Sequence, residues 1–281
     1  MTTLDVLARP SGTFLMVAMD QRDSLRTMLA QHHAQVDDDR LVAFKLAVAR
    51  ELGPYASGFL IDRRYAYDRI VADDLLPSTC RLILAADALE QPQGGVVEDT
   101  RVDAEVEPAP RVVALKYLAI WRDDDERARR VDDCTRFVEL ARSHGLLAVL
   151  EGVVRVDGDR EAAIVEAAAE LSAVGPDLYK CEVPLHGRGD ADEITRWCHE
   201  IDGVLRCPWV VLSQGVDPED FPRAVEASCR GGASGILAGR AVWTATLAAD
   251  DPTELLRSYS VPRLQELAAI VDRHGRPWRE K

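Results

Sequence analysis

Lys180 is the residue of this chain whose setting most directly suggests chemistry. It lies in the segment DLYKCEVP, residues 177–184, which has the pattern of a buried β-strand. Burying an ammonium group costs several kcal/mol unless the group is paired or loses its proton. A desolvated lysine loses its proton more readily, and the free amine can attack a ketone to form an imine, which the permanently charged arginine cannot do. The sequence therefore predicts covalent catalysis at a carbonyl group, with Lys180 as the nucleophile.

Two more charged residues, Lys116 and Glu151, follow two other apolar segments of the chain. We expect Glu151 to transfer protons while the carbinolamine forms and loses water, and Lys116 to disfavour the charged form of Lys180 by like-charge repulsion. A lysine–glutamate ion pair that only holds strands together is the alternative interpretation. Three such residues after three successive strands favour catalysis. The triad needs no metal ion and no organic cofactor, and we predict neither.

Polar residues also follow the first two apolar segments. Asp20 and Gln21 come after the first, where a carboxylate could orient or deprotonate a substrate hydroxyl, although a helix N-cap is an equally good interpretation of Asp20. Asp62 follows the second segment and could polarise a neighbouring lysine. Arg63 and Arg64 could bind an anion or lie at a loop surface. We predict Gln21, Asp62 and Arg64 as substrate-binding residues.

A glycine-rich region near the C-terminal end predicts an anion site. Ser213 and Gly215 follow one apolar segment, and Gly239 and Arg240 follow the next, which the glycine-rich stretch 231–235 precedes. Glycine lets backbone N–H groups approach an anion closely, and arginine adds a forked, permanent charge. Ordinary turn chemistry is the alternative. In barrels the loops after the last two strands often bind phosphate, so we predict that these four residues bind a phosphate group.

The elements that must position these residues are eight short apolar segments that alternate with helical patterns, as in βαβ units. The segments are 14–19, 57–61, 81–85, 112–115, 146–150, 178–179, 209–212 and 235–237. Charged or polar residues follow each of them, and in a (β/α)8 barrel these ends converge on one face. We therefore predict a single TIM-barrel domain over residues 1–281. An open doubly wound sheet is the alternative, but it would not gather all eight ends, and no GxGxxG motif follows the first segment.

Helical patterns fill most of the intervals. One helix is expected to start at the acidic stretch 37–39, and the other patterns lie near 123–143, 159–174, 189–203, 219–229 and 262–273. Lys45 lies inside the first of these helices and is expected to be solvated or to bury only its aliphatic stem. Between the third and fourth strands, Pro92, Gly94, Gly95 and Pro108 interrupt a charged stretch with little helical periodicity. We therefore expect one barrel helix to be missing there.

The composition limits the partners and the compartment. The formal charge of −14 disfavours nucleic acid and anionic membranes as main partners. The six cysteines show neither CxxC nor zinc-like spacing, which is typical of reduced thiols in a cytoplasmic protein. The N-terminal residues lack a signal-peptide pattern, and no apolar stretch approaches the roughly 20 residues of a membrane span. Apolar helix faces on a barrel of this size often pair, so we also expect a homo-oligomer.

Several motifs resemble a known family. They are AMDQR (18–22), PYAS (54–57), WR (121–122), DLYK (177–180), PWVVLS (208–213) and GASGILAGRAVW (232–243). Together they resemble the class I tagatose-bisphosphate aldolases, and within them most closely the sulfofructosephosphate aldolases, over residues 12–272. The resemblance implies that Lys180 forms the Schiff base, Glu151 shuttles protons and Arg240 anchors an anion. The implied reaction splits 6-deoxy-6-sulfofructose 1-phosphate into dihydroxyacetone phosphate and sulfolactaldehyde.

The chain departs from the family pattern at a few positions. Gly152 stands where the family has proline, Arg63 and Arg64 replace a glutamine pair, and Gln214 replaces serine. These changes bear on which second anion is accepted, because sulfonate and phosphate are both tetrahedral oxyanions. Cleavage of tagatose 1,6-bisphosphate is therefore the alternative reaction. A sugar-phosphate sensor that acts through a regulatory partner is the alternative of another class.

Overall fold

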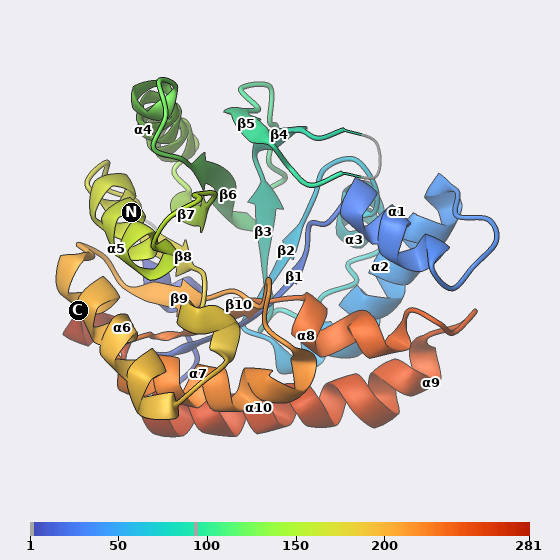
Figure 1. Cartoon of the computed structure of the whole chain (residues 1–281). Helices are drawn as coiled ribbons and strands as arrows, with labels where there is room; N and C mark the ends of the chain where they lie inside the picture. The colour runs from blue at the N-terminus through green and yellow to red at the C-terminus, as the bar shows by residue number, and fades with distance from the viewer. Residues whose placement is uncertain (1–2, 93–94) are drawn as a thin grey trace.

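A computed structural model describes residues 3–92 and 95–281 of the chain. Eight of the described strands pair in parallel and close into a barrel, in the order β1-β10-β9-β8-β7-β6-β3-β2 (Figure 1). These strands are β1 (Phe14–Met19), β2 (Gly58–Ile61), β3 (Arg81–Ala85), β6 (Val112–Trp121), β7 (Leu147–Val154), β8 (Leu178–Cys181), β9 (Trp209–Val211) and β10 (Gly235–Ala238). The predicted TIM barrel is confirmed.

The barrel strands are apolar on both faces because both faces are covered. In β1, Phe14, Met16 and Ala18 point to the barrel interior, where they pack with side chains such as Leu60 and Val210. The alternate residues of β1 belong to a second core between the barrel and its helices. This two-residue period continues along every strand and decides which side chains face the interior.

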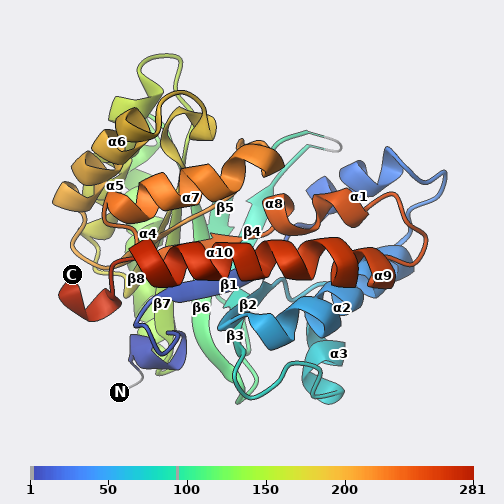
Figure 2. The ribbon, with the colours of Figure 1, turned by 90° about the horizontal axis from the view of Figure 1, so that it is seen from below.

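The helices surround the barrel (Figures 1 and 2). They are α1 (Asp23–Ala30), α2 (Asp38–Leu52), α3 (Tyr67–Ala72), α4 (Arg127–Ser143), α5 (Arg160–Ser172), α6 (Ala191–Val204), α7 (Phe221–Arg230), α8 (Arg240–Trp243), α9 (Thr253–Leu255) and α10 (Val261–His274). The helix expected from residue 37 begins there because Asp37 is the N-cap and accepts a hydrogen bond from the Arg40 N–H. Figure 2 shows α10 beside α7, and it also contacts β1. Short 3-10 turns occur at Leu4–Val6, Gly53–Tyr55, Pro184–Gly187, Pro218–Asp220, Thr244–Thr246 and Trp278–Glu280, and a π-helical turn at Leu256–Ser260.

The interval between β3 and β6 contains a β-hairpin in place of a barrel helix. Strands β4 (Asp87–Glu90) and β5 (Asp99–Val102) pair in antiparallel fashion and stand beside β6 (Figure 1). The expectation that a helix is missing here is confirmed, although Gly94 of the predicted proline-glycine stretch lies outside the described residues. Three strands also differ from expectation: β6, β7 and β8 continue to Trp121, Val154 and Cys181, so Lys116, Glu151 and Lys180 lie within strands instead of after them.

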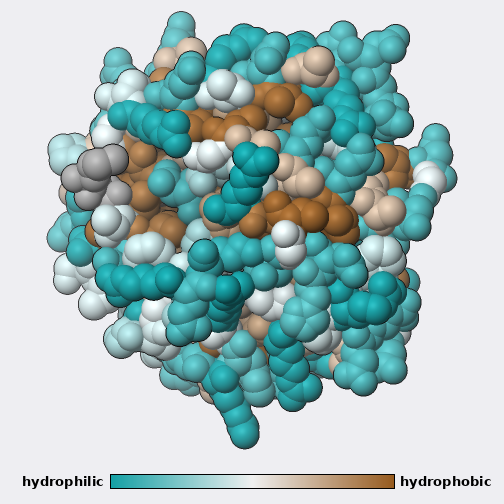
Figure 3. All heavy atoms as spheres, turned by 90° about the vertical axis from the view of Figure 1, so that its left-hand side faces the viewer, coloured by the Kyte–Doolittle hydropathy of each residue, from teal (hydrophilic) through white to brown (hydrophobic). Residues whose placement is uncertain are grey.

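The described surface is mostly polar. Figure 3 shows one face on which hydrophilic side chains interrupt the apolar patches. Among the residues that the structure describes, the exposed large hydrophobic side chains are those of Tyr55, Val96 and Leu255. All six cysteines are buried. None of the described helices is long and apolar enough to cross a bilayer. The expected homo-oligomer stays a prediction.

Candidate active site

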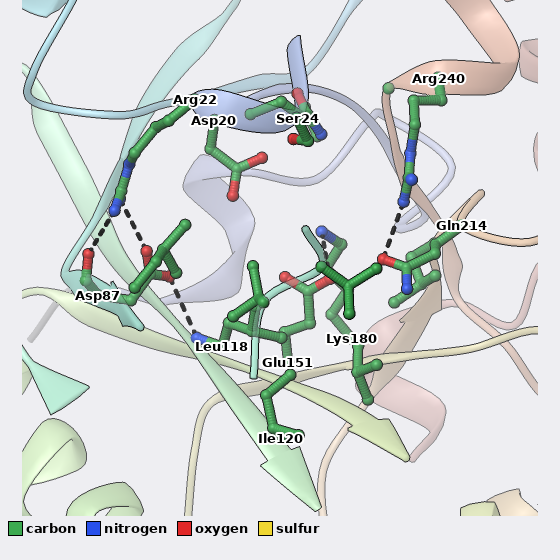
Figure 4. Close-up of a pocket in the computed structure, with 18 of the residues that line it drawn as sticks. Asp20, Arg22, Ser24, Asp87, Leu118, Ile120, Glu151, Lys180, Gln214 and Arg240 are labelled. Atoms are coloured by element: carbon green, nitrogen blue, oxygen red, sulfur yellow. Dashed lines mark hydrogen bonds and ion pairs between the residues drawn. The ribbon is translucent and has the colours of Figure 1, made fainter. Parts of the chain in front are cut away.

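A cavity opens at the carboxyl ends of the barrel strands, where Figure 4 shows its side chains. It has a volume of about 170 Å³. Eight of the residues predicted from the sequence line it: Asp20, Gln21, Lys116, Glu151, Lys180, Ser213, Gly239 and Arg240. The fold therefore gathers most of the predicted site from six different strands and the segments that follow them, as expected for the catalytic face of a barrel.

Strand alternation explains why the three charged residues point into the cavity. On β6, Ala114 belongs to the barrel core and Lys116, two residues later, has the same orientation. On β7, Val149 is followed in the same way by Glu151, and on β8 Leu178 is followed by Lys180. Each charged side chain thus stands one layer above the apolar interior. The pairing of Glu151 with Lys180 in the β7–β8 register brings these two side chains together.

The carboxylate of Glu151 lies between two lysines. Its Oε1 is 3.0 Å from Lys180 Nζ, and its Oε2 is 2.7 Å from Lys116 Nζ. The side chains of all three are less than a tenth exposed. Glu151 can therefore accept a proton from Lys180 or return it without any large movement, which is the geometry that acid–base catalysis at an amine requires.

Lys116 is the most strongly paired cation of the cavity. Besides Glu151, its Nζ lies 2.9 Å from Asp20 Oδ2 and 3.2 Å from Asp87 Oδ2. Burial alone would lower the pKa of Lys116, but the three carboxylates outweigh it and raise that pKa well above its ordinary value of 10.5. Lys116 stays charged, and the carboxylates balance its charge within the cavity.

Asp20 is held in its ionised form by the same cluster. Burial would raise the pKa of its carboxyl, but the positive charges of Lys116, Lys180 and Arg22 prevail and hold the pKa well below its ordinary value of 3.8. Beside it, Gln21 Oε1 is buried and has no hydrogen-bond partner among the described residues. Both groups can therefore accept hydrogen bonds from hydroxyl groups of a ligand.

Asp87 is a residue of the site to which the sequence analysis assigned no role. Its Oδ2 contacts Lys116 and accepts a hydrogen bond of 3.2 Å from the Leu118 N–H, while Arg22 donates one bond to Oδ1 and one to the Asp87 carbonyl, each of 2.8 Å. Asp87 thereby joins Lys116 to Arg22, as Figure 4 shows for its contacts with Arg22 and Leu118. Its position two residues after the third strand was the signal that could have revealed it.

The opposite side of the cavity carries Ser213, Gly239 and Arg240, three of the four residues predicted to bind a phosphate. Arg240 donates a hydrogen bond of 2.8 Å to Gln214 Oε1, and burial lowers the pKa of its guanidinium. At Gly239 a side chain would collide with the Ala18 carbonyl oxygen, so glycine is required where the two chain segments approach. In Figure 4, Lys180 and Glu151 lie between the Arg240–Gln214 pair and the Arg22–Asp87 pair. The Arg240 side therefore carries a guanidinium with no ion pair among the described residues, whereas on the other side Arg22 pairs with Asp87, and the Lys180 amine lies between the two sides.

Three predicted binding residues do not line this cavity. Asp62 is fully buried and forms an ion pair with Lys45, whose amine also donates a hydrogen bond of 2.9 Å to the Met19 carbonyl. The expectation that Lys45 keeps its amine in solvent, or buries only its stem, is therefore wrong. Arg64 lines an adjacent cavity on the Arg22 side, and Gly215 lines another on the Gln214 side. Asp62 does lie beside a lysine, as predicted, but this ion pair holds α2 against the ends of β1 and β2.

No group of three or more His, Cys, Asp or Glu side chains is arranged to hold a metal ion in the described part of the chain. The carboxylates of Asp20, Asp87 and Glu151 converge on the amine of Lys116 instead. The cation that organises these carboxylates is therefore a side chain of the protein itself.

Comparison with known proteins gives a consistent result. A family model described as DeoC/LacD family aldolase matches residues 14–245. The chain is similar to a tagatose 1,6-diphosphate aldolase of Staphylococcus epidermidis, with 22% identity over 100% of this chain and 98% of that protein. It is also similar to a tagatose 1,6-diphosphate aldolase of Listeria monocytogenes, with 25% identity over 98% of this chain and 92% of that protein.

Two solved structures show how widely this fold is shared. An archaeal fructose 1,6-bisphosphate aldolase superposes with a TM-score of 0.61 at 20% identity, covering 96% of this chain and 97% of that one. A fructose-bisphosphate aldolase from Plasmodium falciparum superposes with a TM-score of 0.72 at 11% identity, covering 97% and 95% of the two chains. At these identities the likeness concerns the barrel fold.

Proposed function

The chain belongs to the DeoC/LacD family of aldolases, and from that premise we propose that it cleaves a phosphorylated ketose through an imine on Lys180. The prediction of an aldolase is confirmed by the family, while the residue roles are our proposal. The observation that supports them most is the contact of 3.0 Å between Lys180 Nζ and Glu151 Oε1 inside the cavity. We further propose that residues 1–281 act as one aldolase domain.

The reaction begins when the neutral amine of Lys180 attacks the C2 carbonyl of the ketose. Glu151 protonates the hydroxyl of the carbinolamine, which leaves as water and gives an iminium ion. The C4 hydroxyl loses its proton, the C3–C4 bond breaks, and its electron pair moves toward the iminium nitrogen to give an enamine and an aldehyde. Protonation of the enamine at C3 and addition of water then release dihydroxyacetone phosphate and the free lysine.

The surroundings of each acid or base suggest how the protons are divided. Glu151 contacts the Lys180 amine and is our choice for the proton transfers at nitrogen and at the carbinolamine oxygen. Asp20 stays ionised at neutral pH and is our choice for accepting the C4 hydroxyl proton, although its lowered pKa makes it a weak base. Lys116 holds both carboxylates in place through its contacts of 2.7 Å and 2.9 Å.

The arginines on the two sides of the cavity give the substrate its direction. We propose that Ser213, Gly239 and Arg240 bind the phosphate on C1, which places C2 near Lys180. The rest of the ketose then extends toward Gln21 and Arg22, where a second anion would share the Arg22 guanidinium with Asp87. A substrate with an anionic group at each end would place one group near each of these two arginines.

The second anion separates two candidate substrates. Sulfoquinovose breakdown supplies 6-deoxy-6-sulfofructose 1-phosphate, and the sequence motifs favour it because they resemble those of sulfofructosephosphate aldolases. Tagatose 1,6-bisphosphate is favoured by the relatives from Staphylococcus and Listeria. Measuring kcat/KM for both ketoses with purified protein decides between them. The preferred substrate should have a kcat/KM at least tenfold higher than the other, which corresponds to about 1.4 kcal/mol of transition-state stabilisation.

Borohydride reduction tests the covalent step. The sequence contains four lysines, at positions 45, 116, 180 and 281, so a reduced adduct with dihydroxyacetone phosphate can be assigned by peptide mass. We expect the adduct on Lys180, its loss in Lys180→Ala, and its full retention in Lys281→Ala. An adduct that persists in Lys180→Ala would refute the assignment of the nucleophile. Turnover of a ketose by the purified protein would at the same time exclude a sensor without catalytic activity.

A further inference from the structure

Arg155 is a cation of the active-site cavity for which neither the family resemblance nor the residue types suggested a role. It follows β7 directly and continues the inward-facing series of Glu151 and Val153, since all three line the cavity. Its backbone N–H donates a hydrogen bond of 2.9 Å to the Trp121 carbonyl, which fixes the start of this segment at the end of β6. The side chain also borders the neighbouring cavity beyond Gln214.

The guanidinium of Arg155 has no carboxylate partner among the described residues. Its side chain donates one hydrogen bond of 3.0 Å, to the Val154 carbonyl. The buried carboxylate of Glu182 is engaged elsewhere: it accepts a hydrogen bond of 2.8 Å from the Val154 N–H and one of 3.1 Å from Arg160. Arg155 therefore brings to this cavity a positive charge with which no described carboxylate pairs.

Arg240, which lines the same cavity, also lacks a carboxylate partner among the described residues. Its guanidinium donates a hydrogen bond to the neutral amide of Gln214, and within the described chain it pairs with no carboxylate. Burial lowers the pKa of Arg240, Glu151 and Asp20 act to raise it, and the positive charge of Arg155 acts to lower it. Arg155 and Arg240 line the same cavity, and two guanidinium groups that repel each other are stabilised when an anion binds to both.

We infer that Arg155 and Arg240 together form a two-armed clamp for the phosphate on the ketone half of the substrate. The inference rests on the proposed aldolase reaction only in identifying the ligand as a phosphorylated ketone. The clamp itself requires a tetrahedral oxyanion and no catalysis. Each arginine can offer two N–H donors to such an anion, whereas Arg240 alone leaves part of the phosphate charge unpaired. Arg155 is thus a binding residue that determines specificity for a phosphorylated ketone.

Calorimetric titration with dihydroxyacetone phosphate and with neutral dihydroxyacetone tests the clamp. We expect Arg155→Gln to raise the Kd of the phosphorylated ketone by about 10- to 100-fold, because one or two charge-assisted hydrogen bonds are lost. Binding of the neutral ketone should be unaffected. Arg155→Lys keeps the charge but not the fork and should lie between the two. Arg122→Gln removes a charge from the wall of the neighbouring cavity and is the matched control, expected to change Kd by less than about threefold.

Unfolding temperatures of the same variants show whether weaker ligand binding results from a destabilised fold. Arg155→Gln relieves the repulsion with Arg240, so the ligand-free variant should be at least as stable as the parent chain, while stabilisation by dihydroxyacetone phosphate should be reduced. An unchanged Kd for the phosphorylated ketone in Arg155→Gln, or an equal loss for both ketones, would overturn the clamp. Borohydride reduction in these samples reports separately on the proposed function: phosphate-dependent binding without an adduct on Lys180 would refute the imine and leave the clamp standing.

Discussion

Lysine is rare in this chain and is placed almost entirely inside it. Four of the 34 basic residues Lys and Arg are lysines, and Lys45, Lys116 and Lys180 are each less than 5% exposed. Arginine supplies the permanent charge elsewhere, including both sides of the active-site cavity. Lysine can lose its proton and arginine cannot, and the buried lysines differ accordingly: burial lowers the pKa of Lys45, whereas three carboxylates raise that of Lys116.

Asp87 offers a test of how strongly Lys116 depends on its carboxylates. We expect Asp87→Asn to lower kcat/KM by about 30-fold, because two charge-assisted contacts to Lys116 and Arg22 are lost. The three carboxylates raise the pKa of Lys116, so removing one must lower it. The alkaline limb of the pH–kcat profile should therefore move to lower pH.

The control for this variant is Asp103→Asn. Asp103 pairs with Arg63 at 3.2 Å outside the catalytic cavity, so its loss should leave the pH profile unchanged. If Asp87→Asn lowers activity without moving the alkaline limb, Asp87 has only a structural role. Circular dichroism of both variants shows whether the barrel is intact.

At the level of elements, the regular part of the barrel was predictable because burial on both faces leaves a clear signal. An apolar strand containing one charged residue, as at Lys116 or Lys180, identifies the strand and its functional side chain together. The β4–β5 hairpin was not predictable as such: Asp87–Glu90 and Asp99–Val102 are short and partly charged, and their pairing depends on β6 beside them.

The roles of individual residues were harder to predict than the strands. Asp62 follows a strand like the other site residues, but it pairs with Lys45 because α2 packs against the barrel, a tertiary relation that the local pattern does not contain. Gly215 follows β9 within two residues of Ser213, yet the turn directs it to the neighbouring cavity. The sequence indicates which face of the barrel a residue reaches, whereas the loops and helices decide which cavity it lines.

Gly152 lies next to Glu151 on β7, so the packing of the strand at Gly152 affects where the Glu151 side chain lies. A side chain at this residue would collide with the hydroxyl of Tyr179 on β8. We expect Gly152→Ala to lower the free energy of unfolding by about 1–3 kcal/mol through overpacking, and to lower kcat because Glu151 is the preceding residue. Denaturant unfolding and steady-state kinetics measure the two effects.

Gly158 provides the matched glycine for comparison. It lies in the loop after β7, where a methyl group on its Cα would have no heavy atom within 4 Å, and its φ lies outside the left-handed region. Gly158→Ala should therefore change neither stability nor activity. Equal behaviour of the two alanine variants would show that the strand tolerates a side chain at Gly152.

For the whole molecule, one polar cluster ties the first residues of the chain to its last long helix. Arg9 donates a hydrogen bond of 2.9 Å and Ser11 one of 2.7 Å to Asp272 on α10, and Thr13, directly before β1, contributes a longer bond. These bonds, the one from Arg9 first, lower the pKa of Asp272 below its ordinary value of 3.8. The cluster holds α10 where β1 and β10 meet, the seam at which the barrel closes.

The stability that Asp272 contributes depends on pH. Its carboxyl has a lower pKa in the folded chain than in the unfolded one, so the contribution is complete above about pH 4 and is lost as the pH falls through the folded value. Because the side chain is 37% exposed, we expect Asp272→Asn to cost no more than about 1 kcal/mol at pH 7. Unfolding curves at pH 7 and pH 3 should show a smaller difference from the parent chain at the lower pH. A difference that grows on acidification would contradict this account.

The buried cysteines have a consequence for an enzyme that makes aldehydes. Aldehydes are electrophiles that add to thiolates, and every turnover of an aldolase releases one beside the protein. Burial raises the pKa of Cys80, Cys198, Cys207 and Cys229 to about 12, and it also raises that of the remaining two thiols. The sulfur atoms are thus both inaccessible to solvent and protonated at neutral pH. The chain protects itself from modification by its own product and presents that product with no competing nucleophile of this kind.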